Sequence, residues 1–157
     1  MLKFKYLVFI ISLFFIDFFS KSYILKNLSL LDSMKVFPGL NFTLVFNQGI
    51  AYGIGWQNSI IFSWLLLIFT ALVIIWLITW LVLNIEHSKL LDLGLSLVIG
   101  GALGNFYDRA FYGYVIDFLD FYINNQHWYI FNLADVFISI GGTLVVSFYL
   151  FYAEKKK

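Results

Sequence analysis

The chain of 157 residues contains no cysteine. Disulfide bonds, thiolate metal sites and cysteine nucleophiles are therefore excluded. Only two histidines are present, His87 and His127, and they fall in separate hydrophilic segments, which is too few for a histidine-rich metal site. Magnesium bound by carboxylates stays possible on this count. The formal net charge is +1, and no basic stripe of the kind that binds nucleic acid is present.

Charge is also scarce, because only 12% of the residues are charged, whereas 62% are hydrophobic and 22% are aromatic. The last two fractions are far above those of soluble proteins. The sequence therefore predicts an α-helical integral membrane protein, and its length predicts a single membrane domain over residues 1–157.

Four apolar segments are long enough to cross the hydrocarbon core of a bilayer, which is roughly 30 Å thick and takes about 20 helical residues. They cover approximately residues 4–25, 59–85, 90–107 and 133–152. The first begins after Lys3 and Lys5, as a secretory signal peptide does. It is too long for one, contains Asp17 and Lys21, and lacks a small-x-small cleavage site, so we expect an uncleaved helix.

The basic residues predict the orientation, because lysine and arginine concentrate in short cytoplasmic segments. One side would carry Lys3, Lys5, Lys89, Lys155, Lys156 and Lys157. The other side would carry Lys21, Lys26, Lys35 and Arg109 over much longer segments. We therefore expect both termini in the cytoplasm and both long inter-helix segments outside.

These two long segments carry strand patterns. Residues 41–47 alternate between apolar and polar side chains, which predicts a short strand on the membrane surface. Residues 48–53 are rich in glycine and predict a turn. Residues 115–123 are aromatic and β-branched, and turn residues 124–126 precede residues 127–131, which together predict a hairpin.

Several polar residues fall in or near the predicted helices. Asp17 and Lys21 are four apart, so they share a helix face and can form an ion pair. The pair either neutralises itself with Lys21 reaching toward the interface, or points into the bundle and supports a site. Asn132 can cap the fourth helix, with Asp135 in its first turn as a carboxylate that the helix dipole favours.

Two carboxylates around one water can hydrolyse a peptide bond without serine, cysteine or metal. One carboxylate removes a proton from the water, while the other, protonated, binds the carbonyl oxygen and later helps to protonate the amine. Asp117 and Asp135 are candidates, because the turn between them returns the chain toward its start. In an extended strand Asp117 and Asp120 point to opposite faces, so only one of them can meet Asp135.

Five motifs in order make the sequence resemble the lipoprotein signal peptidases, the bacterial type II signal peptidases. They are Asp17-x-x-x-Lys21, Asn47-x-Gly49-x-Ala51, Gly101-Ala-Leu-Gly-Asn105-x-x-Asp108-Arg109, Gly113-Tyr-Val-Ile-Asp117-Phe and Phe131-Asn132-x-Ala134-Asp135. The resemblance covers nearly the whole chain. It departs at Phe18, where the family usually has Gln, and at Ile50 and Tyr52, where the family commonly has Ala and Phe.

The resemblance implies an aspartic endopeptidase with Asp117 and Asp135 as catalytic residues, leaving Asp120 to face solvent or brace the loop. The positions that it implies as substrate-lining or supporting are Asn47, Gly49, Asn105, Arg109, Asn132, Asp17, Lys21 and Asp108. Its implied substrates are prolipoproteins that carry a diacylglyceryl group on a cysteine and are cut just before it. We expect a monomer in the bacterial inner membrane, without metal or other cofactor, whose site faces the outer leaflet.

Two other functions compete with this interpretation. A small transporter or proton-conducting subunit would account for Asp17, Lys21 and Asp92 within spans, although it predicts acidic groups spread through the membrane depth. A phospholipid alcohol-transferase needs several aspartates at helical spacing around Mg²⁺. Only Asp117 and Asp120 approach that pattern, and they lie on a predicted strand.

Overall fold

The computed structural model describes residues 4–49, 60–83, 88–124 and 126–151. The helices long and apolar enough to cross a membrane are α1 (Phe4–Asn27), α2 (Ile60–Leu83), α3 (Lys89–Tyr112) and α4 (Leu133–Phe151). A helix of 24 residues is roughly 36 Å long, which exceeds the thickness of the hydrocarbon core. The four predicted spans are confirmed, within a few residues at most ends.

The third helix is longer than predicted. Its expected end was residue 107, but α3 continues to Tyr112 and ends where Gly113 adopts a left-handed conformation with φ of 78°. The Gly113 N–H then bonds the carbonyl oxygen of Arg109 at 3.2 Å. The apolar pattern ends before the helix does, since the last turns carry polar side chains that face other protein groups. Asp108 and Arg109 therefore belong to a helix.

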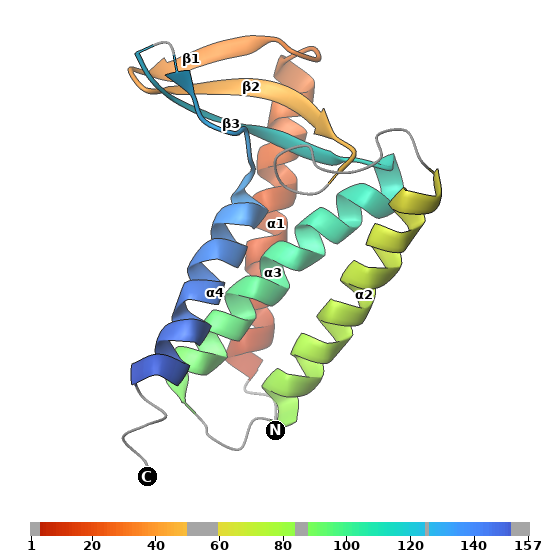
Figure 1. The fold of residues 1–157 in the computed structure, drawn as a ribbon, viewed down its shortest axis with the longest axis vertical. Coiled ribbons are helices and arrows are strands. Elements are labelled where there is room, and N and C mark those ends of the chain that lie inside the picture. Colours follow the sequence, from red (N-terminus) through yellow and green to blue (C-terminus); the bar gives the residue numbers. More distant parts are fainter. Residues whose placement is uncertain (1–3, 50–59, 84–87, 125, 152–157) are drawn as a thin grey trace.

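A four-stranded antiparallel sheet, in the order β1-β2-β3-β4, lies at one end of the helix bundle (Figure 1). Its strands are β1 (Ser33–Phe37), β2 (Leu40–Asn47), β3 (Val115–Ile123) and β4 (Gln126–His127). The predicted strand at residues 41–47 and the predicted hairpin are confirmed, with Tyr122 opposite His127, but the second strand of the hairpin is Gln126–His127 and does not extend over residues 127–131. In the register of β2 and β3, Val45 lies opposite Asp117. The predicted turn at residues 48–53 lies largely outside the described residues.

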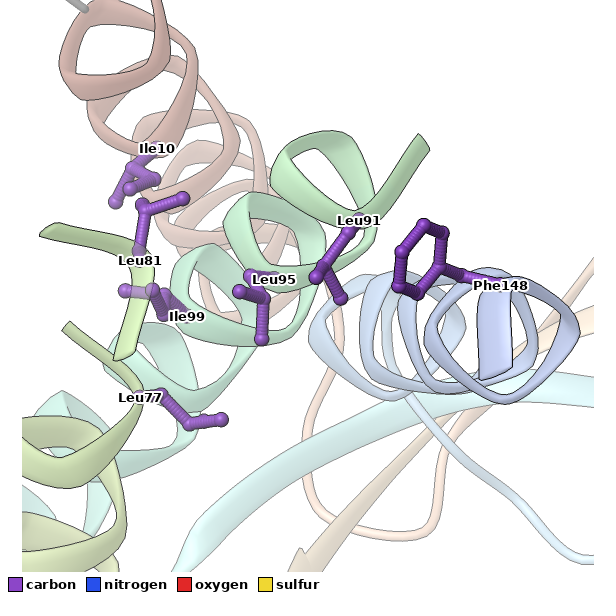
Figure 2. Close-up of a cluster of buried hydrophobic side chains, with 7 residues drawn as sticks. All are labelled: Ile10, Leu77, Leu81, Leu91, Leu95, Ile99 and Phe148. Carbon is purple, nitrogen blue, oxygen red and sulfur yellow. The ribbon is translucent and has the colours of Figure 1, made fainter. Parts of the chain in front are cut away.

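Helix α3 is the centre of the bundle, between α1, α2 and α4 (Figure 1). Buried side chains from all four helices meet along it (Figure 2) and are Ile10, Leu77, Leu81, Leu91, Leu95, Ile99 and Phe148. A second apolar cluster joins α1 to the sheet and contains Ile24, Leu40, Leu44, Ile116, Phe118 and Leu119. The sheet is therefore packed on the bundle by its own core.

Small residues let α3 approach its neighbours closely. A Cβ atom on Gly100 would lie 2.7 Å from Cβ of Leu13, and one on Gly104 would collide with the Asp17 carboxylate. Both contacts are with α1, so Gly100 and Gly104 form a small-residue face that permits close packing of the two helices. Gly101 faces the other neighbour, since its Cβ would collide with the Ala134 carbonyl oxygen on α4. This packing brings Asp17 and the start of α4 beside α3, where the polar site forms.

Candidate active site

Asp117 lies on β3 and is almost completely buried, with 1% of its surface exposed. Its Oδ1 accepts a hydrogen bond of 2.6 Å from Nδ2 of Asn132. Its Oδ2 accepts one of 2.9 Å from Nδ2 of Asn47, at the end of β2. Two side-chain amides from different elements therefore fix the orientation of this carboxyl group.

Asp135 lies in the first turn of α4 and forms a reciprocal cap with Asn132. The backbone N–H of Asp135 donates to Oδ1 of Asn132 at 3.0 Å, and Oδ2 of Asp135 accepts from the backbone N–H of Asn132 at 3.2 Å. This is the arrangement of a capping box. The predicted cap is confirmed, and the other oxygen of Asp135 is left to face the site.

Asn105 on α3 connects Asp135 to the rest of the site. Its Nδ2 donates to Oδ1 of Asp135 at 2.8 Å. Its Oδ1 accepts from Nζ of Lys21 at 3.1 Å and from Nδ2 of Asn132 at 3.2 Å. Asn132 thus contacts Asp117, Asp135 and Asn105, so the two aspartates belong to one hydrogen-bonded network built from the sheet and from two helices.

A buried ion-pair cluster lies behind this network. Nζ of Lys21 is 2.6 Å from Oδ2 of Asp17 and 2.9 Å from Oδ2 of Asp108. Asp17 also accepts a hydrogen bond of 2.9 Å from the Ala134 N–H, and Asp108 accepts one of 3.1 Å from the Ile116 N–H. Lys21 is 2% exposed, so the interpretation in which it reaches the interface is wrong. The pair points into the bundle and ties α1 to α3, α4 and β3.

The surroundings of Asp117 favour its protonated form. Burial, and after it the negative charge of Asp135, raise the pKa of Asp117 to about 7. The hydrogen bonds from Asn47 and Asn132 and the charge of Lys21 act against this rise. Arg109 on α3 also attracts both carboxylates. Near neutral pH Asp117 can therefore hold a proton, as the acid of an aspartate dyad must.

Two cavities meet the aspartates. One, of about 420 Å³, is bordered by Asp117 together with Asn47, Gly49 and Tyr129. The other, of about 520 Å³, is bordered by Asp135, Tyr129 and apolar residues of α4. A chain segment that touches both carboxylates would therefore pass Tyr129.

All ten residues that the sequence singled out lie at the sheet end of the bundle. Gly49 borders the first cavity, donates its N–H to Oδ1 of Asn47 at 2.9 Å, and accepts a long contact of 3.4 Å from Nη2 of Arg109. Sequence reasoning missed Tyr129, whose hydroxyl lies 2.6 Å from Nδ2 of Asn47. The available signal was that Tyr129 is a polar aromatic residue shortly before the cap of α4. This signal did not indicate which residue the hydroxyl would contact.

Asp120 is separate from this network. It is buried, with 3% exposed, so the expectation that it could face solvent is wrong. Its Oδ2 accepts a hydrogen bond of 2.8 Å from the Thr43 hydroxyl, and its Oδ1 lies 2.8 Å from Nδ1 of His127. These contacts join β2, β3 and β4, which agrees with the expectation that Asp120 braces the loop region.

Comparison with known proteins identifies the family. The family model described as signal peptidase (SPase) II matches residues 9–151. The chain belongs to the signal peptidase II family. The lipoprotein signal peptidase of Wigglesworthia glossinidia brevipalpis is 39% identical, over 92% of this chain and 94% of its own. That of Francisella tularensis subsp. novicida (strain U112) is 37% identical, over 98% and 96%.

A solved structure of a bacterial membrane enzyme has the same fold as this chain. A bacterial membrane enzyme determined by the in meso method at 2.3 Å resolution superposes with a TM-score of 0.88 at 29% identity, over 99% of this chain and 93% of the other. The predicted architecture and the predicted aspartic peptidase class are thus confirmed. Membership in the signal peptidase II family does not favour the transporter or proton-conducting subunit.

Proposed function

We propose that this signal peptidase II removes signal peptides from diacylglyceryl-modified prolipoproteins, cutting just before the lipid-bearing cysteine, with Asp117 and Asp135 as its catalytic residues. The observation that carries the proposal is the bridge through Asn132, which bonds Asp117 through its side chain and caps the helix of Asp135. The names of the relatives support the substrate class.

In the proposed reaction, Asp117 holds the proton of the dyad, because burial and then the charge of Asp135 raise its pKa to about 7. Asp135 removes a proton from water, whose oxygen forms a bond to the scissile carbonyl carbon. Asp117 donates its hydrogen bond to the carbonyl oxygen as negative charge develops there. The C–N bond then breaks, the amine of the cysteine takes up the proton that the dyad gained from the water, and the signal peptide leaves with a new carboxylate.

Supporting roles follow from the contacts of the other residues. Asn47, Asn105 and Asn132 orient the carboxyl groups through the hydrogen bonds that they donate. Arg109 stays protonated, so we assign it to stabilising the loop at Gly49 or the substrate backbone, not to proton transfer.

The test is cleavage of a diacylglyceryl-modified lipobox peptide by purified variants at matched amounts of folded protein. Asp117→Asn and Asp135→Asn should each abolish measurable cleavage, and the double variant should be no worse than either. Asp120→Asn is the matched control, since Asp120 is a buried aspartate on the same strand that bonds outside the network. Substantial turnover by Asp117→Asn, or loss only in Asp120→Asn, would show that the wrong aspartate has been assigned.

We also propose that the protein lies in the bacterial inner membrane with both termini in the cytoplasm and the site toward the outer leaflet. The starts of α1 and α3, the helix turns to which Lys5 and Lys89 belong, lie at the end of the bundle away from the sheet, which supports this orientation (Figure 1). A cytoplasmic reporter fused after Lys157 should be active, and a tag inserted at Asn125 should be reachable from outside. The reverse pattern would place the site at the wrong leaflet.

Finally, we propose that residues 1–157 work as one domain and as a monomer. Every side chain in the network comes from one chain, through α1, β2, α3, β3 and α4. The mass of the active protein in detergent, measured by light scattering, should therefore be that of one chain, and activity found only in a dimer would contradict this.

A further inference from the structure

Tyr129 is held in a fixed place between the hairpin and α4. The Trp128 N–H before it bonds the carbonyl oxygen of Phe121 at 2.7 Å, and the Phe131 N–H after it bonds that of Leu119 at 3.2 Å. Both anchors are on β3, the strand that carries Asp117. The Tyr129 side chain therefore has a defined position relative to that aspartate, and it borders the cavities of both carboxyl groups.

The Tyr129 hydroxyl completes the hydrogen bonding of Asn47. The Nδ2 group of Asn47 has two hydrogens, of which one is donated to Oδ2 of Asp117 at 2.9 Å and the other to the Tyr129 hydroxyl oxygen at 2.6 Å. The Oδ1 atom of Asn47 accepts from the Gly49 N–H at 2.9 Å. With all three positions used, a rotated amide would turn its oxygen toward a carboxylate, so only one orientation suits the site.

We propose that Tyr129 is a positioning residue of this peptidase, whose hydroxyl holds the Asn47 side chain in the orientation that donates to Asp117. The inference rests on the proposed catalytic role of Asp117. Tyr129 acts through Asn47 and performs no proton transfer itself. Its contribution is to keep one of the two amide donors aimed at the carboxyl group during turnover.

The charged groups around Asp117 determine the expected pH effect. They are Asp135 on α4, Lys21 on α1 and Arg109 on α3. The hydrogen bond from Asn47 opposes the rise in the pKa of Asp117 that burial causes. A weaker bond from Asn47 therefore leaves that pKa higher. If Asp117 is the acid, the basic limb of the pH profile should move to higher pH.

The experiment compares Tyr129→Phe, which keeps the ring, with Tyr122→Phe as a control that removes a hydroxyl from β3 outside the network. Rates on the diacylglyceryl-modified lipobox peptide are taken per folded molecule. Tyr129→Phe should lower kcat roughly three- to tenfold, the effect of one hydrogen bond, with KM little changed and the basic limb moved upward. Tyr122→Phe should match wild type in both respects.

A double variant tests whether Tyr129 acts through Asn47. Tyr129→Phe combined with Asn47→Ala should be no slower than Asn47→Ala alone. Independent losses that multiply, or an unmoved pH profile in Tyr129→Phe, would overturn the inference. Asp117→Asn is measured alongside: if it is inactive while Tyr129→Phe behaves as wild type, only the role of Tyr129 falls, whereas activity in Asp117→Asn rejects the proposed dyad itself.

Discussion

Asn132 donates a 2.6 Å hydrogen bond to Asp117 from the position that caps the helix of Asp135. The Asn132 side chain thus fixes the position of Asp117 on β3 relative to Asp135 on α4. The site exists because the β3–β4 hairpin returns the chain to the point where α4 begins. Its geometry therefore depends on the junction of sheet and bundle, and the variants below test the groups that hold this junction.

Lys21 should be essential for stability, because it is the cation between the buried carboxylates of Asp17 and Asp108. Lys21→Met would leave these groups without their counter-charge, and breaking a buried pair in this way costs about 3–5 kcal/mol. Lys26→Met, on the same helix but at an exposed position, is the control. Thermal unfolding in detergent should show a large loss for the first and little change for the second; equal stability would contradict the assigned ion pairs.

Close packing of α3 on α4 predicts that alanine substitutions at Gly101 and Gly142 differ in their effect on stability. Gly101→Ala would push its methyl group into the Ala134 carbonyl oxygen and to 2.9 Å from Cγ1 of Ile138, so it should destabilise by about 1–3 kcal/mol. A Cβ on Gly142 meets nothing within 4 Å, and Gly142→Ala should be neutral or stabilise by up to about 1 kcal/mol. Unfolding temperatures of the two variants decide this, and equal effects would refute the close approach.

The fold was largely predictable where the signal is local. Apolar length located the spans, alternation located β2, and aromatic and β-branched residues next to turn residues located the hairpin, because each signal depends on neighbours in sequence. The strand Ser33–Phe37 was not predicted, since all five of its residues are exposed and no buried face produces an alternating pattern. The end of α3 was placed too early because polar residues facing a buried network resemble those of a loop.

The site was predictable only in part, for a related reason. The family resemblance selected Asp117 and Asp135, but their hydrogen-bond partners come from distant parts of the chain. Asn47 lies 70 residues before its partner Asp117 in the sequence. The second partner of Asn47, Tyr129, lies 82 residues after Asn47. Such pairs follow from the packing of sheet against bundle, which no local pattern records.

Hydrolysis should proceed without a metal ion. All four oxygens of the two aspartates accept N–H groups, from Asn132 and Asn47 at Asp117 and from Asn105 and Asn132 at Asp135. Hydrogen-bond donors at every oxygen orient the two carboxyl groups for proton transfer. A bound cation would instead take the place of these donors. Cleavage of the lipobox peptide should therefore survive EDTA. Activity lost in the chelator and restored by Mg²⁺ or Zn²⁺ would reject the aspartate mechanism.

The last prediction concerns the effect of pH on stability through Asp117. Its pKa is raised from 3.8 to about 7 in the folded protein, chiefly because burial disfavours the charged form. Between these pH values the folded state keeps a proton that the unfolded state releases. The free energy of unfolding of the wild type should therefore fall as the pH rises from about 4 to about 7, and the loss should be constant above that.

Asparagine does not titrate, so Asp117→Asn should be free of this loss. The replacement also changes the hydrogen bonds with Asn47 and Asn132, which shifts its stability by an amount that does not follow the titration of Asp117. The informative quantity is thus the difference in unfolding temperature between variant and wild type, measured in detergent from pH 4 to pH 8. It should move in favour of Asp117→Asn up to about pH 7 and then level off; a difference that stays constant would mean that Asp117 titrates alike in both states.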